Sequence, residues 1–192
     1  MAGRLFDKLE QEAFRAGIAA RTKASMEWFR STVSNRKVSR AALIGDGPTR
    51  SRQVYGSMYN FQYDPKTKAT LPYYDRFPLC IPVQKAKGGF YGLNLHYLHP
   101  LIRAQFLDEL YDITNNDKYD RTTKMNVTYQ LLKSTSKMRF FKPCLKHYVS
   151  NQIQSPLLLI EPADWEIAIF LPTESFRKVD KNTVWNESRS KF

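Results

Sequence analysis

Two apolar runs joined by a short basic turn occupy the middle of this chain, at residues 71–95 (LPYYDRFPLCIPVQKAKGGFYGLNL). Such runs predict an antiparallel hairpin, and the aromatic alternation of VYGSMYNFQY before them predicts one more strand. Three strands so close together in the chain predict a curled antiparallel sheet. Because Pro78 and Pro82 have no amide hydrogen, the strand that contains them must lie at a sheet edge or carry bulges.

The turn of this hairpin is basic and rich in glycine. Gly88 and Gly89 can adopt the positive φ that a tight hairpin needs, so we expect Lys85 and Lys87 at an exposed tip. Such a tip can lie along the phosphates of duplex DNA or enter one of its grooves. An ordinary solvated turn has the same composition, and the pattern leaves both interpretations open.

The rest of the core is predicted to be mainly helical. Residues 100–114 begin with proline in the first turn and place apolar side chains along one broad face. These are Leu101, Ile102, Phe106, Leu110 and Ile113. A second helix is predicted over 121–137, and LLLIEP is typical of a buried strand. The pattern predicts an α+β fold, in which helices cover a small twisted antiparallel sheet or SH3-like barrel. We expect this core domain at 54–176 and a charged tail at 177–192.

The first 34 residues mix charges with apolar residues at helical spacing. They predict a basic arm of one long or two short amphipathic helices, broken near Gly17. Its apolar residues are too many for a solvated tether, so we expect a second subunit or the chain's own core to cover them. The predicted partner-binding residues are Phe6, Leu9, Phe14, Trp28 and Phe29. Residues 35–53 have little periodicity and predict a flexible basic connector.

The chain of 192 residues carries 30 Lys and Arg against 18 Asp and Glu, a net charge of +12. This surplus favours a phosphate backbone, an anionic membrane or an acidic protein as partner. No apolar run approaches the roughly 20 residues that span a bilayer, and residues 1–20 do not resemble a signal peptide. We therefore expect a soluble protein made in a cytosol, with no membrane partner. Its Cys80 and Cys144 are expected to be buried thiols.

Basic residues cluster with aromatic ones at 133–146, where there is no acid. Together with the connector and the hairpin tip, this cluster supplies the residues that we predict to contact DNA phosphates. They are Arg36, Lys37, Arg40, Arg50, Arg52, Lys85, Lys87, Lys133, Lys137, Arg139, Lys142 and Lys146. A solvated charged face is the alternative interpretation of such runs.

Signatures of catalysis and metal binding are weak. His96 and His99 lie three residues apart without the further ligands of a zinc site. Two groups of carboxylates have the chemistry to hold magnesium in a nuclease. They are Glu161, Asp164 and Glu166, and Asp108, Glu109 and Asp112. No Walker loop, dinucleotide fingerprint or nucleophile elbow is present. The sequence predicts a protein that is not an enzyme and has no cofactor or metal, with a metal-dependent nuclease as a minor alternative.

Several phrases of the chain resemble a known family. They are YDPKTKATLPYYDRFPL, GGFYGLNLHYLHPLIRAQFLDEL, YDRTTKMNVTYQLLKSTSKMRFFKPCLKHYVSNQI, EPADWEIAIFLPTESF and NTVWNESRSK. Across about residues 54–191 the chain resembles the DNA end protector protein of T-even-type tailed bacteriophages. The resemblance implies a head-completion protein that binds the ends of the packaged linear genome. It also implies that the protein shields these ends from the RecBCD-type exonuclease of the host, without a catalytic residue.

These observations favour binding without chemistry. The basic clusters would neutralise phosphates at a duplex terminus while an aromatic side chain covers the last base pair. Tyr73, Tyr74 and Phe90 are candidates for that contact, with core packing as the alternative for each. The predicted partners are double-stranded DNA ends and other virion subunits (portal, neck or tail). The predicted locations are the virion and the host cytoplasm during assembly and after injection. The alternative is a structural protein of the phage neck or tail that anchors to neighbouring subunits.

Overall fold

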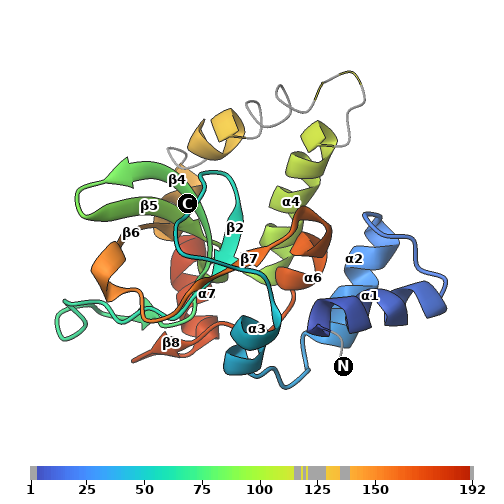
Figure 1. Cartoon of the computed structure of the whole chain (residues 1–192), viewed down its shortest axis with the longest axis horizontal. Coiled ribbons are helices and arrows are strands. Elements are labelled where there is room, and N and C mark those ends of the chain that lie inside the picture. The colour runs from blue at the N-terminus through green and yellow to red at the C-terminus, as the bar shows by residue number, and fades with distance from the viewer. Residues whose placement is uncertain (1–3, 115–117, 119, 121–128, 135–138, 191–192) are drawn as a thin grey trace.

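The computed structural model describes residues 4–114, 118, 120, 129–134 and 139–190 (Figure 1). Its main element is an antiparallel sheet with the strand order β1-β7-β2-β4-β5-β6. The strands are β1 (Thr49–Arg50), β2 (Met58–Asn60), β4 (Leu79–Ala86), β5 (Gly89–Asn94), β6 (Leu145–Val149) and β7 (Leu157–Ile160). A small second sheet pairs β3 (Tyr74–Asp75) with β8 (Phe176–Arg177). The predicted α+β fold is confirmed, and the described strands form an open sheet and not the alternative barrel.

The predicted hairpin consists of β4 and β5. Strand β4 lies inside the sheet, between β2 and β5, so an edge position does not account for Pro78 and Pro82. Instead, the register shifts between Pro82 and Gln84, and the pairing of β2 with β4 ends at Cys80. The bulge therefore accommodates the proline that has no amide to donate.

The two glycines of the hairpin turn are required for different reasons. Ala86 pairs with Gly89, which leaves Lys87 and Gly88 as the turn, and Gly88 has a φ of 71°. The predicted positive φ is confirmed for Gly88 and wrong for Gly89. Gly89 lies so close to strand β6 that a Cβ atom there would be 1.9 Å from the carbonyl oxygen of Tyr148.

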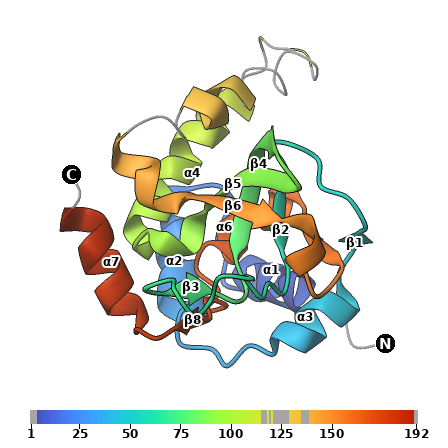
Figure 2. The same cartoon turned by 90° about the vertical axis from the view of Figure 1, so that its left-hand side faces the viewer.

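Helices cover one face of the sheet (Figure 2). They are α1 (Leu5–Arg15), α2 (Lys23–Val33), α3 (Arg40–Asp46), α4 (Pro100–Thr114), α6 (Trp165–Ala168) and α7 (Lys181–Ser190). Helix α4 has the predicted bounds and buries Phe106 and Leu110, but Leu101 is 42% exposed and does not belong to its buried face. Of the helix predicted over 121–137, residues 129–134 are helical, while 121–128 and 135–138 lie outside the described residues.

The amino-terminal arm consists of two helices, and both belong to the main core. They are separated at Gly17, which has a φ of 72°, and Thr22 begins α2 with a capping box to Ser25. Apolar side chains of both helices are buried with those of α4, α6 and the sheet. Figure 1 shows α1 and α2 at one end of the long axis and the β4–β5 hairpin toward the other.

The predicted flexible connector and the predicted charged tail both contain regular elements. Residues 35–53 contain α3, which Ser39 caps, and strand β1, which pairs with β7. The expected tail contains α7, whose Val184 and Trp185 are buried. In both cases a few apolar residues within a charged stretch are enough to attach it to the core. Within the described part, no helix is both long and apolar enough to cross a membrane.

Candidate nucleic-acid interface

Acidic residues are absent from the whole main sheet. Residues 47–63, 76–107 and 121–160 contain thirteen Lys or Arg and no Asp or Glu, and all six strands come from these ranges. The acids lie in the helical arm, in α3, in the loop after β2, in β3, in and after α4 and in the carboxyl-terminal part. Because the six strands carry no acid, and Arg50, Arg52, Lys85, Lys87, Lys142 and Lys146 lie on them or next to them, this part of the molecule would attract a polyanion.

A polar groove lies beside strand β1. It has a volume of about 730 Å³ and is lined by residues 49–53 on one side and by residues of 150–157 on the other. Arg50 and Arg52 are exposed here, opposite Ser150 and Ser155. Guanidinium forks, hydroxyls and backbone amides are the groups that bind phosphate oxygens in proteins. No carboxylate lines the groove.

The hairpin tip adjoins this groove. The amide of Ser150 donates to the carbonyl of Gly88 over 2.9 Å, which fixes one wall of the groove against the turn. Lys85 and Lys87 are exposed on the hairpin. Four of the predicted DNA-binding residues, from two distant parts of the chain, therefore lie around one surface. We call it the tip–groove surface and define it as Arg50, Arg52, Lys85, Lys87, Ser150 and Ser155.

The other three predicted cations of the connector lie elsewhere. Arg36 forms a salt bridge with Glu12 of α1. Arg40 donates to the carbonyls of Thr173 (2.8 Å) and Glu174 (2.6 Å) and so attaches α3 to the carboxyl-terminal part. Lys37 is exposed, but beside α3 and not at the hairpin. The structure thus gives two of these three residues contacts within the chain.

The 133–146 cluster is described only in part. Lys133 is exposed on the helical segment 129–134, and Lys142 is exposed on the 3-10 helix η2 (Arg139–Cys144). The ammonium of Lys146 lies 3.9 Å from the ring centre of Tyr97, a cation–π contact. Lys137 and the side chain of Arg139 lie outside the described residues.

The predicted stacking aromatics are occupied within the fold. Phe90 is fully buried against Tyr148 in an aromatic cluster on the sheet. Tyr73 lies against Tyr97, and burial together with a hydrogen bond to Glu187 raises the pKa of Tyr73 to about 12. Tyr74, half-buried, pairs with Arg177 in the small sheet. For Phe90, core packing is the role that the structure supports.

Sequence reasoning missed Tyr91, the neighbour of Phe90. Tyr91 is 39% exposed, and its ring centre lies 5.2 Å from that of His147 on β6. Side chains alternate between the two faces of a strand, so a buried Phe90 places Tyr91 on the opposite face. This alternation is the signal that was available, but it identifies the exposed ring only once the buried one is known.

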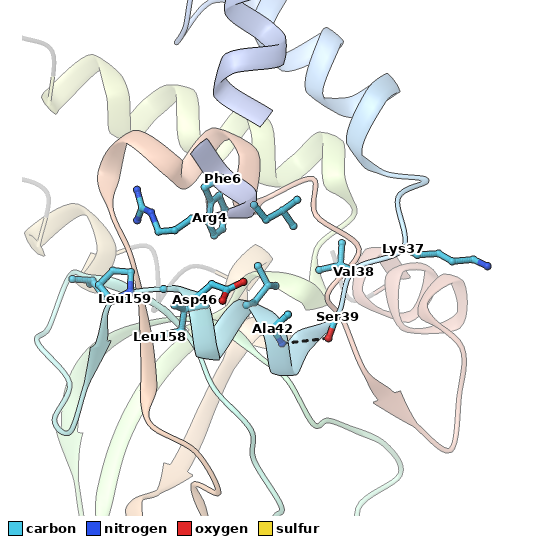
Figure 3. A pocket seen from close by; sticks show the side chains of 13 residues that line it. Arg4, Phe6, Lys37, Val38, Ser39, Ala42, Asp46, Leu158 and Leu159 are labelled. Carbon is cyan, nitrogen blue, oxygen red and sulfur yellow. Dashed lines mark hydrogen bonds between the residues drawn. The ribbon is translucent and has the colours of Figure 1, made fainter. Parts of the chain in front are cut away.

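An apolar crevice between α1, α3 and β7 does not continue the basic surface (Figure 3). Its volume is about 190 Å³, and its lining includes Phe6 and Leu158. Figure 3 shows that Lys37 points away from it, and Asp46 belongs to its lining. An apolar crevice with a carboxylate in its lining is not suited to bind phosphate.

Two of the six carboxylates considered for a nuclease, Asp164 and Glu166, attach the arm. The Asp164 carboxylate is buried 3.8 Å from the guanidinium of Arg4, and burial raises the pKa of Asp164 to about 6. Glu166 is buried too and accepts hydrogen bonds from the hydroxyl of Ser25 and the amide of Arg21. Burial also raises the pKa of Glu166. Among the described residues, no three His, Cys, Asp or Glu are grouped to hold a metal ion.

A buried polar chain resembles a catalytic triad in its order. Asp75 accepts from Nδ1 of His96 over 2.7 Å, and Nε2 of His96 lies 3.2 Å from the hydroxyl of Thr173. All three residues are buried, and none lines a described groove, so substrate has no access to them. Burial opposes ionisation of Asp75, yet His96 and two backbone amides hold the pKa of Asp75 below its ordinary value. These hydrogen bonds link Asp75 of β3 in the small sheet to His96, which follows β5 of the main sheet.

The remaining sequence predictions at this level concern the cysteines and His99. Cys80 and Cys144 are both free and buried, as predicted. His99 packs against Trp185 with ring centres 5.2 Å apart, and burial lowers the pKa of His99. It is therefore separated from His96, which faces Asp75.

The basic surface on an acid-free sheet agrees with the comparison to known families. The model of the family described as Phage T4 terminal DNA protecting protein matches residues 3–189. The chain belongs to this family. The match includes the arm and α7 as well as residues 54–189. No curated protein and no solved structure matches the chain.

Proposed function

We propose that this phage protein binds the ends of linear double-stranded DNA through the tip–groove surface and shields them from a RecBCD-type exonuclease of the host. The observation that carries the proposal is an acid-free sheet in a chain of the terminal DNA protecting family. On this sheet Arg50 and Arg52 line a groove, and Ser150 of that groove is hydrogen-bonded to the hairpin turn that carries Lys87. The protein would act in head completion, travel in the virion and remain on the ends after injection into the host cytoplasm.

The mechanism is steric and electrostatic. Arginine forks and serine hydroxyls of the groove bind phosphates of the last turns of the duplex, and the lysines of the hairpin bind phosphates beside them. Each neutralised phosphate releases condensed counterions, which supplies most of the affinity. The bound protein then occupies the space in which an exonuclease would engage the end. No step requires a metal, a cofactor or a protein nucleophile, so DNA should stay intact when magnesium is added.

The salt dependence of binding tests this surface. For a linear duplex, log K should fall with log salt by about 0.9 for each phosphate that the protein contacts. Arg50→Ala and Arg52→Ala should each reduce that slope by about 1. Lys37→Ala, an exposed cation away from the groove, is the matched control and should leave the slope unchanged. Equal slopes for all three variants would contradict the proposed interface.

Exposed apolar surface favours a second role in attachment to another virion subunit. Of the five residues predicted to bind a partner, Phe6, Leu9 and Phe29 are buried in the chain's own core. Phe14 is 83% exposed beside a groove of about 500 Å³ between the arm and α6, and Trp28 is half-buried. We therefore assign the proposed contact to Phe14. Phe14→Ser should reduce incorporation into particles and leave DNA affinity unchanged.

A further inference from the structure

Phosphate contacts alone do not explain how a protein would prefer a DNA end. Phosphates repeat along the whole duplex, so a purely electrostatic surface binds the interior as well as the terminus. A terminus differs in one chemical feature, because only the last base pair exposes a flat aromatic face to solvent. A protein that selects ends by contact needs an exposed, supported aromatic surface beside its phosphate-binding groups.

The sheet provides such a surface next to the hairpin tip. Gln84, Tyr91 and His147 lie side by side across β4, β5 and β6, in register and on one face. All three are exposed. Further along the same face, Ile81 and Leu93 are paired and fully buried in the core beneath the helices. The helices therefore cover this face at Ile81 and Leu93 but leave the row Gln84–Tyr91–His147 exposed.

The two rings of this row are held in place. Their centres lie 5.2 Å apart with an angle of 39° between the planes. Nε2 of His147 donates to the carbonyl of Lys87 over 3.2 Å, which fixes the imidazole against the hairpin turn. Tyr91 is braced by this ring on β6 and stands on a strand paired on both sides. A ring that is already ordered loses little conformational entropy when it stacks.

The surroundings suit a nucleic-acid terminus more than an apolar protein partner. Lys87 lies in the hairpin turn, three residues after Gln84 of the row. Ser150 of the phosphate groove is three residues beyond His147, about 10 Å along an extended chain. The row and the groove therefore lie near the same end of β6, the row on the face of Ile81 and Leu93 and the groove beside the opposite face, which carries Phe90 and Tyr148. No acid occurs in 76–107 or 121–160, which contain the whole row.

We propose that Tyr91, supported by His147, stacks on the terminal base pair and gives the protein its preference for DNA ends. This inference rests on the proposed function and adds the residue that distinguishes an end from the interior. Stacking on a base face is independent of sequence, because every base has such a face. Gln84 flanks Tyr91 on β4 and offers an amide to the edge of the same base pair.

The test compares the affinity for a linear duplex with that for a closed circular duplex of the same sequence. Wild type should bind the linear form more tightly, and Tyr91→Ala should lose this preference by about 5- to 150-fold, the range for one base–aromatic stack. Its affinity for the circle should stay unchanged. Tyr91→Phe keeps the ring and should restore the preference. Lys87→Ala is the matched control and should weaken binding to both forms equally.

A second readout reports the stack directly. With 2-aminopurine in the terminal base pair, fluorescence should change on binding of wild type and Tyr91→Phe but not of Tyr91→Ala at saturation, and an interior 2-aminopurine should not respond. If Tyr91→Ala, folded by circular dichroism, keeps the full end preference and the terminal signal, the stacking proposal is wrong while the phosphate interface stands. If wild type binds neither form, the proposed function fails and the stacking proposal with it.

Discussion

Arg4 contacts two carboxylates whose pKa values move in opposite directions. Its guanidinium lies 2.7 Å from Asp7, and this hydrogen bond lowers the pKa of Asp7. The same guanidinium is 3.8 Å from Asp164, where burial outweighs the attraction and raises the pKa to about 6. One cation therefore links the start of α1 to the segment before α6. The carboxylate of Asp164 is buried in this contact, and it is easier to protonate than an exposed carboxylate.

This pair predicts opposite effects of pH on stability. Because folded Asp164 binds its proton more tightly than the unfolded chain does, its contribution to the free energy of unfolding falls as pH rises from about 4 to about 6. Asp164→Asn should therefore gain stability relative to wild type over that interval. Asp7→Asn should lose stability relative to wild type as pH rises through about 4, since ionised Asp7 is the favoured form. Urea unfolding at several pH values measures both differences, and slopes of the same sign would contradict this account.

The two glycines of the hairpin turn predict different costs for an added methyl group. Gly88→Ala strains only the backbone, because nothing lies within 4 Å of its Cβ position, and should cost about 1–2 kcal/mol. Gly89→Ala forces strands β5 and β6 apart and should cost about 3 kcal/mol or more. Gly88→Asn, which tolerates positive φ, is the control and should cost less than Gly88→Ala. Thermal unfolding ranks the three, and a milder effect at Gly89 than at Gly88 would show that the strands adjust easily.

Helix α1 shows how one element divides its apolar residues between core and solvent. Leu9 is fully buried and Phe14 is 83% exposed, although both belong to the same amphipathic helix. The buried side chains of α1 pack in one core with those of α2 and α6. Phe14 lies outside this packing, at the groove between the arm and α6. The arm is thus a layer of the fold with one apolar residue left outside.

This division predicts a difference in stability between two substitutions in one helix. Leu9→Ala should destabilise the protein by about 2–5 kcal/mol, as for a buried leucine. Phe14→Ser should change stability by less than about 0.5 kcal/mol, as for an exposed site. Chemical denaturation of the full chain measures both. A large loss for Phe14→Ser would mean that this side chain packs within the chain after all.

Much of this organisation follows from the sequence, but the contacts between distant segments do not. Periodicity predicts α4 and the break at Gly17, and turn chemistry predicts the β4–β5 hairpin. Local pattern cannot place β1 beside β7 or Ser150 beside Gly88, because these contacts join residues far apart in the chain. For the same reason, sequence alone treats Arg40 and Arg50 alike, although one binds backbone carbonyls and the other lines a groove.

At the scale of the molecule, the strands of the main sheet carry cations and no acid, whereas the helices carry charges of both signs. A uniform basic surface would bind any polyanion in any orientation, whereas this distribution favours one orientation toward DNA. Helices α1 and α2, with the exposed Phe14, then face away from DNA. The central claim is that position, and not net charge alone, determines protection.

Protection of a linear duplex from a RecBCD-type exonuclease tests that claim most directly. The interface variant changes Arg50, Arg52 and Lys87 to Glu, and the matched control changes the exposed Lys8, Lys23 and Lys37 of the helical side to Glu, with the same change in net charge. The account predicts that wild type and the control variant preserve the full-length duplex while the interface variant leaves it degraded. Equal protection by both variants, or equal loss in both, would contradict the assignment of the end-binding surface.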